Sequence, residues 1–127
     1  MRIHSLISVD GVPFGTPREG LPDLGTPVRD YINRLGDHVL DFGKIIYRFG
    51  AEGMVEVSFP LPTVIDLNGH EVEGSALLAY LEQHDASFRR AHGFGVAATL
   101  GIAVDLDDDE HWTTVFVAGR WDQSNDA

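Results

Sequence analysis

Cysteine is absent from this 127-residue sequence. That absence excludes disulfide bonds and thiol catalysis, and it is consistent with a reducing compartment. No segment approaches the ~20 consecutive apolar residues that a membrane-spanning helix needs. Residues 1–10 contain one basic residue and no apolar run of signal-peptide length. We therefore expect a cytoplasmic protein without a membrane anchor.

Basic residues are also scarce, since nine Lys and Arg stand against 20 Asp and Glu, for a net charge of −11. The imbalance lies mostly in the second half. Residues 1–63 carry eight acids and six bases (−2), and residues 64–127 carry twelve acids and three bases (−9). Nucleic acids and anionic membranes need a basic surface, so both are excluded as expected partners. A basic protein partner is the natural complement. An acidic surface that only keeps the protein soluble is the alternative.

The length and the hydrophobic content of 43% predict one globular domain over residues 1–127, with residues 122–127 as a frayed tail. A chain of this size buries a core without help from metal or disulfides.

The segment 14–27 has the start and stop signals of a short helix. Thr16 is expected as the N-cap, Pro17 as the first helical residue and Glu19 as the capping-box partner. Gly25 is expected to end the helix in the left-handed conformation. Residues 28–37 are expected to continue as an irregular helix that ends at Gly36.

A second and longer helix is predicted over residues 75–92, with Ser75 as N-cap and Gly93 as the stop. Alternating apolar residues predict strands elsewhere. The expected strands cover residues 2–9, 45–49, 55–59, 63–67, 96–106 and 112–117. The pattern predicts an α+β fold: an antiparallel β-sheet of about five to six strands, with one short N-terminal helix and one longer helix packed on one face.

The motifs of common catalytic and metal sites fail on spacing or context. His84 and His92 are eight residues apart on the predicted helix, too distant for one zinc ion. The acidic run 105–110 begins like a calcium loop, but Glu110 stands where that loop needs glycine. The glycine pattern at residues 93–98 follows a helix, whereas a dinucleotide loop follows a strand. We therefore expect no metal, no cofactor and no catalytic residues.

The run of acids between the last two strands is the strongest local charge in the chain, and it is expected at an exposed hairpin tip. If the protein binds a basic partner, this tip is the expected contact. The candidate partner-binding residues are Asp105, Asp107, Asp108, Asp109, Glu110, Asp122 and Trp112.

The motif Phe-Gly-Thr-Pro-Arg at residues 14–18, followed by Leu24-Gly25 and Pro27, resembles a family of small bacterial proteins of toxin–immunity type. The tract from Tyr47 to Phe59, the Asn68-Gly69 turn and the late Leu100-Gly101-Ile102 segment extend the resemblance over most of the chain. A related helix-then-sheet motif occurs in the β-lactamase inhibitor protein. The resemblance implies a binding protein and carries over no catalytic residue.

Three functions are consistent with these features. The first is a non-catalytic inhibitor, in its sharpest form an immunity protein that occludes the active site of a basic, nucleic-acid-targeting toxin. The second is a structural component of a phage or another assembly. The third is a small α+β enzyme with a pocket between the sheet and the long helix, using Tyr80 or His84 with a carboxylate. The sequence leaves the oligomeric state open.

Overall fold

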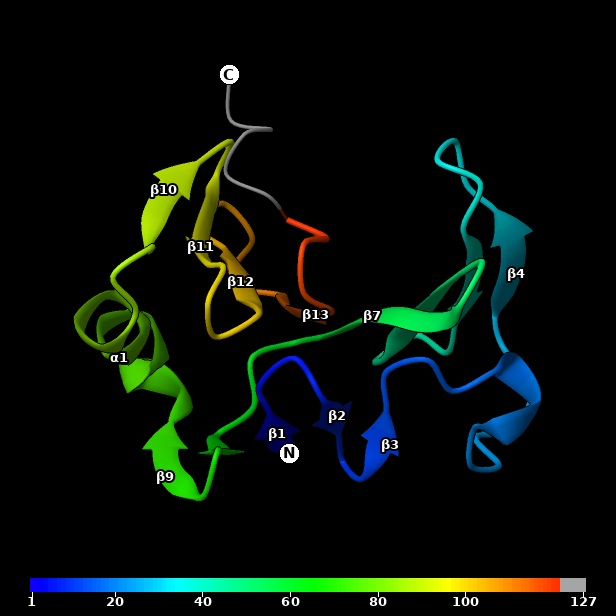
Figure 1. The fold of residues 1–127 in the computed structure, drawn as a ribbon, viewed down its shortest axis with the longest axis horizontal. Coiled ribbons are helices and arrows are strands. Elements are labelled where there is room, and N and C mark those ends of the chain that lie inside the picture. Colours follow the sequence, from blue (N-terminus) through cyan, green and yellow to red (C-terminus); the bar gives the residue numbers. More distant parts are fainter. Residues whose placement is uncertain (122–127) are drawn as a thin grey trace.

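The computed structural model describes residues 1–121, so the predicted tail at residues 122–127 lies outside the described residues. Within them the protein is mostly β, with two sheets and one short helical segment (Figure 1). The α+β expectation is therefore wrong, and so is the expectation of two helices on one sheet.

The larger sheet has eight strands, all paired antiparallel with their neighbours. It runs from β10 at the left of Figure 1 to β4 at the right. Its strands, in spatial order, are β10 (Arg89–Ala91), β11 (Phe94–Ala97), β12 (Ile102–Asp105), β13 (Thr113–Phe116), β7 (Gly53–Phe59), β6 (Ile46–Gly50), β5 (His38–Asp41) and β4 (Arg29–Ile32).

The smaller sheet has five short strands and includes one parallel pair, between β1 and β8. The predicted strand over residues 2–9 is interrupted at Leu6, which has a positive φ, so the segment forms a hairpin. The strands of this sheet, in spatial order, are β3 (Val12–Pro13), β2 (Ser8–Val9), β1 (Arg2–His4), β8 (Val64–Leu67) and β9 (His70–Glu73).

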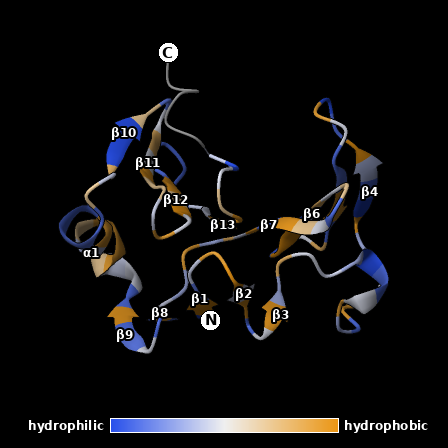
Figure 2. Ribbon diagram, viewed as in Figure 1, coloured by the Kyte–Doolittle hydropathy of each residue, from blue (hydrophilic) through white to orange (hydrophobic). Residues whose placement is uncertain are grey.

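The main core lies between one face of the eight-stranded sheet, the five-stranded sheet and the helical segment. Alternate residues of the large sheet point into it, and they meet apolar residues of β1, β8 and the helix. Figure 2 colours the helix partly hydrophilic and partly hydrophobic, as expected for a helix that buries one side. The largest fully buried members of this core are Ile3, Met54, Val57, Ile65, Leu67, Leu77, Leu81, Ile102 and Val115.

The predicted helix at residues 14–27 is wrong. The segment contains only the 3-10 turn η1 (Arg18–Gly20), none of whose residues is buried. Thr16 does not cap it, because its hydroxyl donates backward to the carbonyl oxygen of Pro13 at 2.6 Å. A short helix depends on packing for its stability, and in this segment only Phe14 and Leu21, both partly buried and both outside η1, pack against the core.

Residues 28–37 form a hairpin arm rather than an irregular helix. β4 pairs with β5 along its length, and Gly36 has a φ of +87° in the turn between them. Glycine adopts that left-handed conformation without steric cost. The glycine is therefore a turn residue and not a helix terminator.

The predicted helix over residues 75–92 is correct in place and wrong in length. The 3-10 turn η2 (Gly74–Ala76) continues into α1 (Leu77–His84), and Ser75 makes no capping hydrogen bond. The chain leaves the helix at Asp85, and residues 89–91 form β10. Leu77 and Leu81 are buried in the core, as the periodicity predicted.

The apolar run at residues 96–106 is two strands and not one. β11 and β12 pair across the turn at residues 98–101, with Val96 opposite Ala103 and Ala97 opposite Ile102. The turn shifts the alternation, so that Ala97 and Ile102 face the main core. Val96, Ala103 and Phe116 form a second, smaller cluster on the opposite face of the sheet.

Candidate functional site

The acidic run connects β12 to β13, and this confirms its predicted place at the turn of the last hairpin. Asp107, Asp109 and Glu110 are exposed, whereas Asp105 and Asp108 are half-buried. The five predicted acids thus divide into three that face solvent and two that lie against the turn itself.

The two half-buried acids shape the turn. Oδ1 of Asp105 accepts the backbone N–H of Asp107 at 3.0 Å, and Oδ1 of Asp108 accepts that of Glu110 at 2.7 Å. Such bonds between a carboxylate and a backbone N–H two residues later define Asx turns. Asp105 and Asp108 therefore act as structural residues, and they present the other three carboxylates to solvent.

Two further contacts attach the turn to the body of the protein. The backbone N–H of Leu61 donates to the carbonyl oxygen of Glu110 at 3.1 Å, and the Lys44 ammonium lies 3.6 Å from the Glu110 carboxylate. The Lys44 pair is exposed on both sides, so it contributes little to stability. The backbone bond fixes the turn beside the segment that leaves β7.

Trp112 does not join the exposed acids. Trp112 is half-buried, and its carbonyl oxygen accepts the N–H of Asp105 at 2.8 Å. Asp122 lies outside the described residues. The other tryptophan, Trp121, packs against Phe94 and Phe116 with ring centroids 5.2 and 5.4 Å away.

A cavity of about 770 Å³ lies beside the acidic turn. Its walls come from the segment that follows β7, the start of η2 and α1, and the two ends of the turn. Spacing along the chain gave no signal for it, because tertiary packing alone brings these four segments together. The lining residues are Leu61, Pro62, Thr63, Val64, Glu73, Gly74, Ser75, Leu77, Leu78, Val104, Leu106 and His111.

The walls of this cavity are mainly aliphatic, and their charged member is Glu73. Leu106 and His111 join the cavity directly to the acidic turn. No lysine or arginine is among the lining residues. We call this cavity together with Asp107, Asp109 and Glu110 the acid-rimmed cavity. Such a site suits a partner surface on which an apolar side chain lies next to a positively charged one.

A second polar cluster ties the far end of β13 to the opposite face of the large sheet. Arg120 donates to Oε1 of Glu56 at 2.8 Å and also pairs with Asp37, while Nε1 of Trp121 donates to the same Glu56 oxygen at 2.9 Å. Burial disfavours the charged guanidinium, but hydrogen bonds to Asp37 and Glu56 outweigh it and raise the pKa of Arg120. Because each charge has a partner, we interpret this cluster as a structural contact that holds the C-terminal segment against the large sheet.

The two residues considered for catalysis, Tyr80 and His84, lie together on α1. The rings of Tyr80 and His84 lie 4.2 Å apart on α1, but neither lines the acid-rimmed cavity. Among residues 1–121, no group of three or more His, Asp or Glu side chains is arranged to hold a metal ion. No helix in that range has the length and hydropathy needed to cross a membrane.

Searches of protein-family models, curated proteins and solved structures find no match to this chain. The resemblance to toxin–immunity proteins therefore stays a prediction from sequence motifs.

Proposed function

We propose that this protein is a non-catalytic binding protein that uses the acid-rimmed cavity to recognise a basic protein. In its sharpest form it is a cytoplasmic immunity protein that neutralises a toxin with a basic, nucleic-acid-binding cleft. The observation that carries the proposal is the exposure of Asp107, Asp109 and Glu110 in a turn whose two ends, Leu106 and His111, line an aliphatic cavity without lysine or arginine.

The two parts of the site have different physical roles. The exposed carboxylates speed the encounter with a positively charged partner, since long-range attraction acts mainly on the association rate. The cavity offers a desolvated contact for an apolar side chain of that partner, and such central contacts control dissociation. A phosphate-binding cleft on a toxin presents both the charge and the apolar groups of its nucleobase contacts.

The test is a growth assay with the product of the gene adjacent to the gene for this chain. Co-production of this chain is expected to restore growth that the neighbouring product inhibits, through a one-to-one complex seen by native mass spectrometry. The variant Asp107→Asn/Asp109→Asn is expected to protect less well and to associate roughly tenfold more slowly at low salt.

The matched control is Glu19→Gln/Glu52→Gln, which removes the same charge from two exposed acids outside the site. It should protect as well as wild type. A second variant, Val64→Thr, tests the cavity, because Val64 is a partly exposed lining residue. It should leave association unchanged and speed dissociation. A neighbouring product that leaves growth intact, or equal losses in the site and control variants, would refute the proposal.

A further inference from the structure

The two sheets have four edge strands in the described part of the chain, and three of them carry features that discourage pairing with another strand. β3 has two residues and ends in Pro13, β9 carries Glu71 and Glu73, and β10 carries Arg89 and Arg90. Proline, short length and charge are the usual protections of a sheet edge. β4 also carries two charged residues, Arg29 and Asp30, but it has four residues and no proline, and Asp30 is paired with Arg18 and His38 within the chain.

β4 is exposed at all four positions, and it lies at the outer edge of the large sheet, at the right of Figure 1. Most of the large exposed hydrophobic residues of the described chain lie on this strand or beside it. Ile32 is 65% exposed and Leu35 is 81% exposed. Val28 and Tyr31 are exposed as well. Successive strand residues point to opposite faces, so Tyr31 and Ile32 expose apolar side chains on both faces of this edge, and an exposed apolar edge strand is prone to pair with a further strand.

The backbone of β4 has two residues free to pair outward. The N–H of Asn33 donates to the carbonyl oxygen of Asp37 across the hairpin at 2.9 Å. In an antiparallel ladder the bonded residues alternate, so Tyr31 also points its backbone groups at β5. The N–H and C=O groups of Asp30 and Ile32 therefore point away from the sheet.

We propose that β4 pairs antiparallel with β4 of a second copy of this chain, with the two-fold axis at Tyr31. In this register Asp30 of one copy lies opposite Ile32 of the other, and the outward groups of both residues are paired. Tyr31 meets Tyr31 of the second copy in the closer, non-hydrogen-bonded position, where aromatic pairs stabilise a sheet. The dimer joins two eight-stranded sheets into one continuous sheet.

The neighbouring registers are less favourable. Moving the axis to Asp30 places two Asp30 carboxylates opposite each other and uses the N–H of Val28, which already donates to Asp41 at 2.8 Å. Moving it to Ile32 requires pairing from Arg34, which lies in the turn after the strand. The Tyr31 register avoids both costs.

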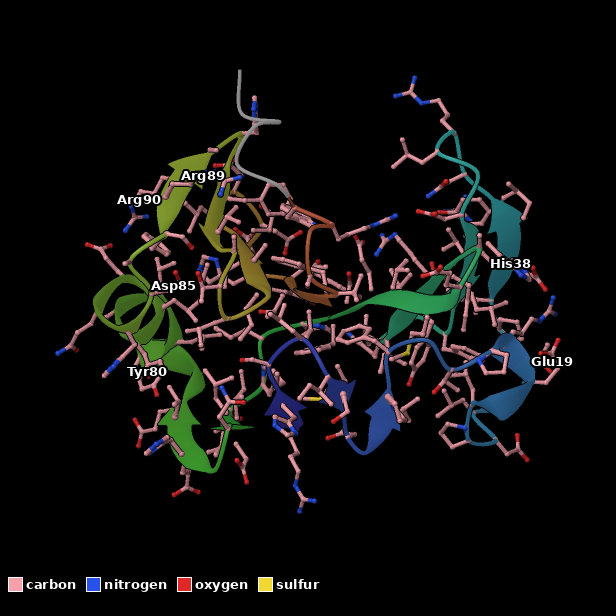
Figure 3. All side chains as sticks on the ribbon, in the orientation of Figure 1. Glu19, His38, Tyr80, Asp85, Arg89 and Arg90 are labelled. Carbon is pink, nitrogen blue, oxygen red and sulfur yellow. The ribbon has the colours of Figure 1, made fainter. Side chains whose placement is uncertain are left out.

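Local charge also permits two copies to meet here. Residues 24–36 contain two arginines (Arg29 and Arg34) and one aspartate (Asp30), a net charge of +1 in a chain of −11. The carboxylate of Asp30 is in addition paired with Arg18 at 3.1 Å and bonded to His38, which Figure 3 labels at this end of the protein. The contact therefore keeps the strongly acidic second half of the chain out of the interface.

The decisive variant is Ile32→Pro, which removes an outward N–H and leaves the β4–β5 bonds intact, as proline does on the open side of an edge strand. Sedimentation velocity from micromolar to submillimolar concentration gives the mass. Wild type is expected at twice the chain mass of 13.9 kDa, and Ile32→Pro as a monomer with an unchanged melting temperature. The control Ile7→Ser removes an exposed hydrophobic residue elsewhere and should leave the dimer intact.

Tyr31→Glu gives an independent answer if the proline variant fails to fold. It places like charges at the axis and should raise the dimer dissociation constant roughly tenfold or more. A monomeric wild type over the whole range would overturn the proposal, and so would a dimer unaffected by either substitution.

Discussion

The carboxylate of Asp85 accepts the backbone N–H of Leu100 at 2.9 Å, and so fastens the end of α1 to the turn between β11 and β12. The same carboxylate accepts the N–H of Ser87 at 2.8 Å. Asp85 is 3% exposed and lies between α1 and the strands β10–β12 (Figure 3). Burial disfavours its charged form, but hydrogen bonds from Ser87 and Leu100 outweigh burial and hold the pKa of Asp85 below its ordinary value.

Replacing Asp85 by alanine should destabilise the fold, because it leaves the N–H groups of Ser87 and Leu100 without an acceptor. The expected loss in free energy of unfolding is about 1–3 kcal/mol at neutral pH. Urea denaturation of wild type and Asp85→Ala measures it. Glu82→Ala is the control, since that acid is exposed on the same helix.

The contribution of Asp85 should depend on pH. Because its pKa is lower in the folded state than in the unfolded chain, ionised Asp85 stabilises the fold fully above the unfolded value of about 3.9. That stability is lost as the pH falls toward and through the folded pKa. The difference in unfolding free energy between wild type and Asp85→Asn should therefore narrow between about pH 5 and about pH 3. A constant difference over this range would contradict the assignment.

Removing the Arg120 side chain should be more damaging than removing an exposed arginine. Its partners Asp37 and Glu56 have side chains only 6% and 9% exposed, so Arg120→Met takes the Arg120 cation from both and leaves Glu56 with Arg48 alone, at 3.5 Å. Such a loss costs about 3–5 kcal/mol. The double variant Arg120→Met/Glu56→Gln should recover part of it. Thermal unfolding of both variants, with Arg90→Met as the exposed control, tests this.

The core position of the β11–β12 hairpin is Ile102 and not Leu100. Ile102 is fully buried on β12, whereas Leu100 is half-buried in the turn. Ile102→Ala should cost about 2–5 kcal/mol. Leu100→Ala should cost clearly less, because truncating a half-buried side chain removes less buried apolar surface. Equal losses in urea denaturation would contradict this difference in burial.

Substitution at the acidic turn should separate structure from charge. Asp108→Ala removes the acceptor of the Glu110 N–H and should destabilise the hairpin by about 1 kcal/mol. Asp109→Ala should change stability by less than about 0.5 kcal/mol, since this acid is exposed. Melting temperatures of the two variants compare them directly.

Local patterns predicted several elements correctly. The hairpin of β6 and β7 follows from two alternating runs around a glycine-containing turn, and Asn68 and Gly69 adopt positive φ as an Asn-Gly turn should. The acidic turn of the last hairpin was also predicted. Exposure was expected for Asp107, Asp108, Asp109 and Glu110, because consecutive charges cannot be buried without partners. The expectation is correct for three of them, whereas Asp108 is half-buried because its carboxylate accepts the N–H of Glu110.

Other elements depended on contacts that no local pattern carries. Capping signals at residues 14–27 predicted a helix, but only Phe14 and Leu21 of that segment pack against the core, and both are only partly buried. The alternating apolar residues at 96–106 predicted one strand, because their spacing of two continues through the turn at residues 98–101. The turn nevertheless changes the face, so that Val96 lies in the smaller cluster and Ile102 in the main core.

The sequence by itself determined the lack of disulfides, the acidic second half and the positions of the main hairpins, since each follows from residue type or short-range spacing. Tertiary structure alone decided the number of helices, the split into two sheets, the acid-rimmed cavity and the exposure of β4. Helices as short as these form only where burial offsets the lost chain entropy. A cavity or an open edge likewise arises from how distant segments pack, and that packing is not written in any one of them.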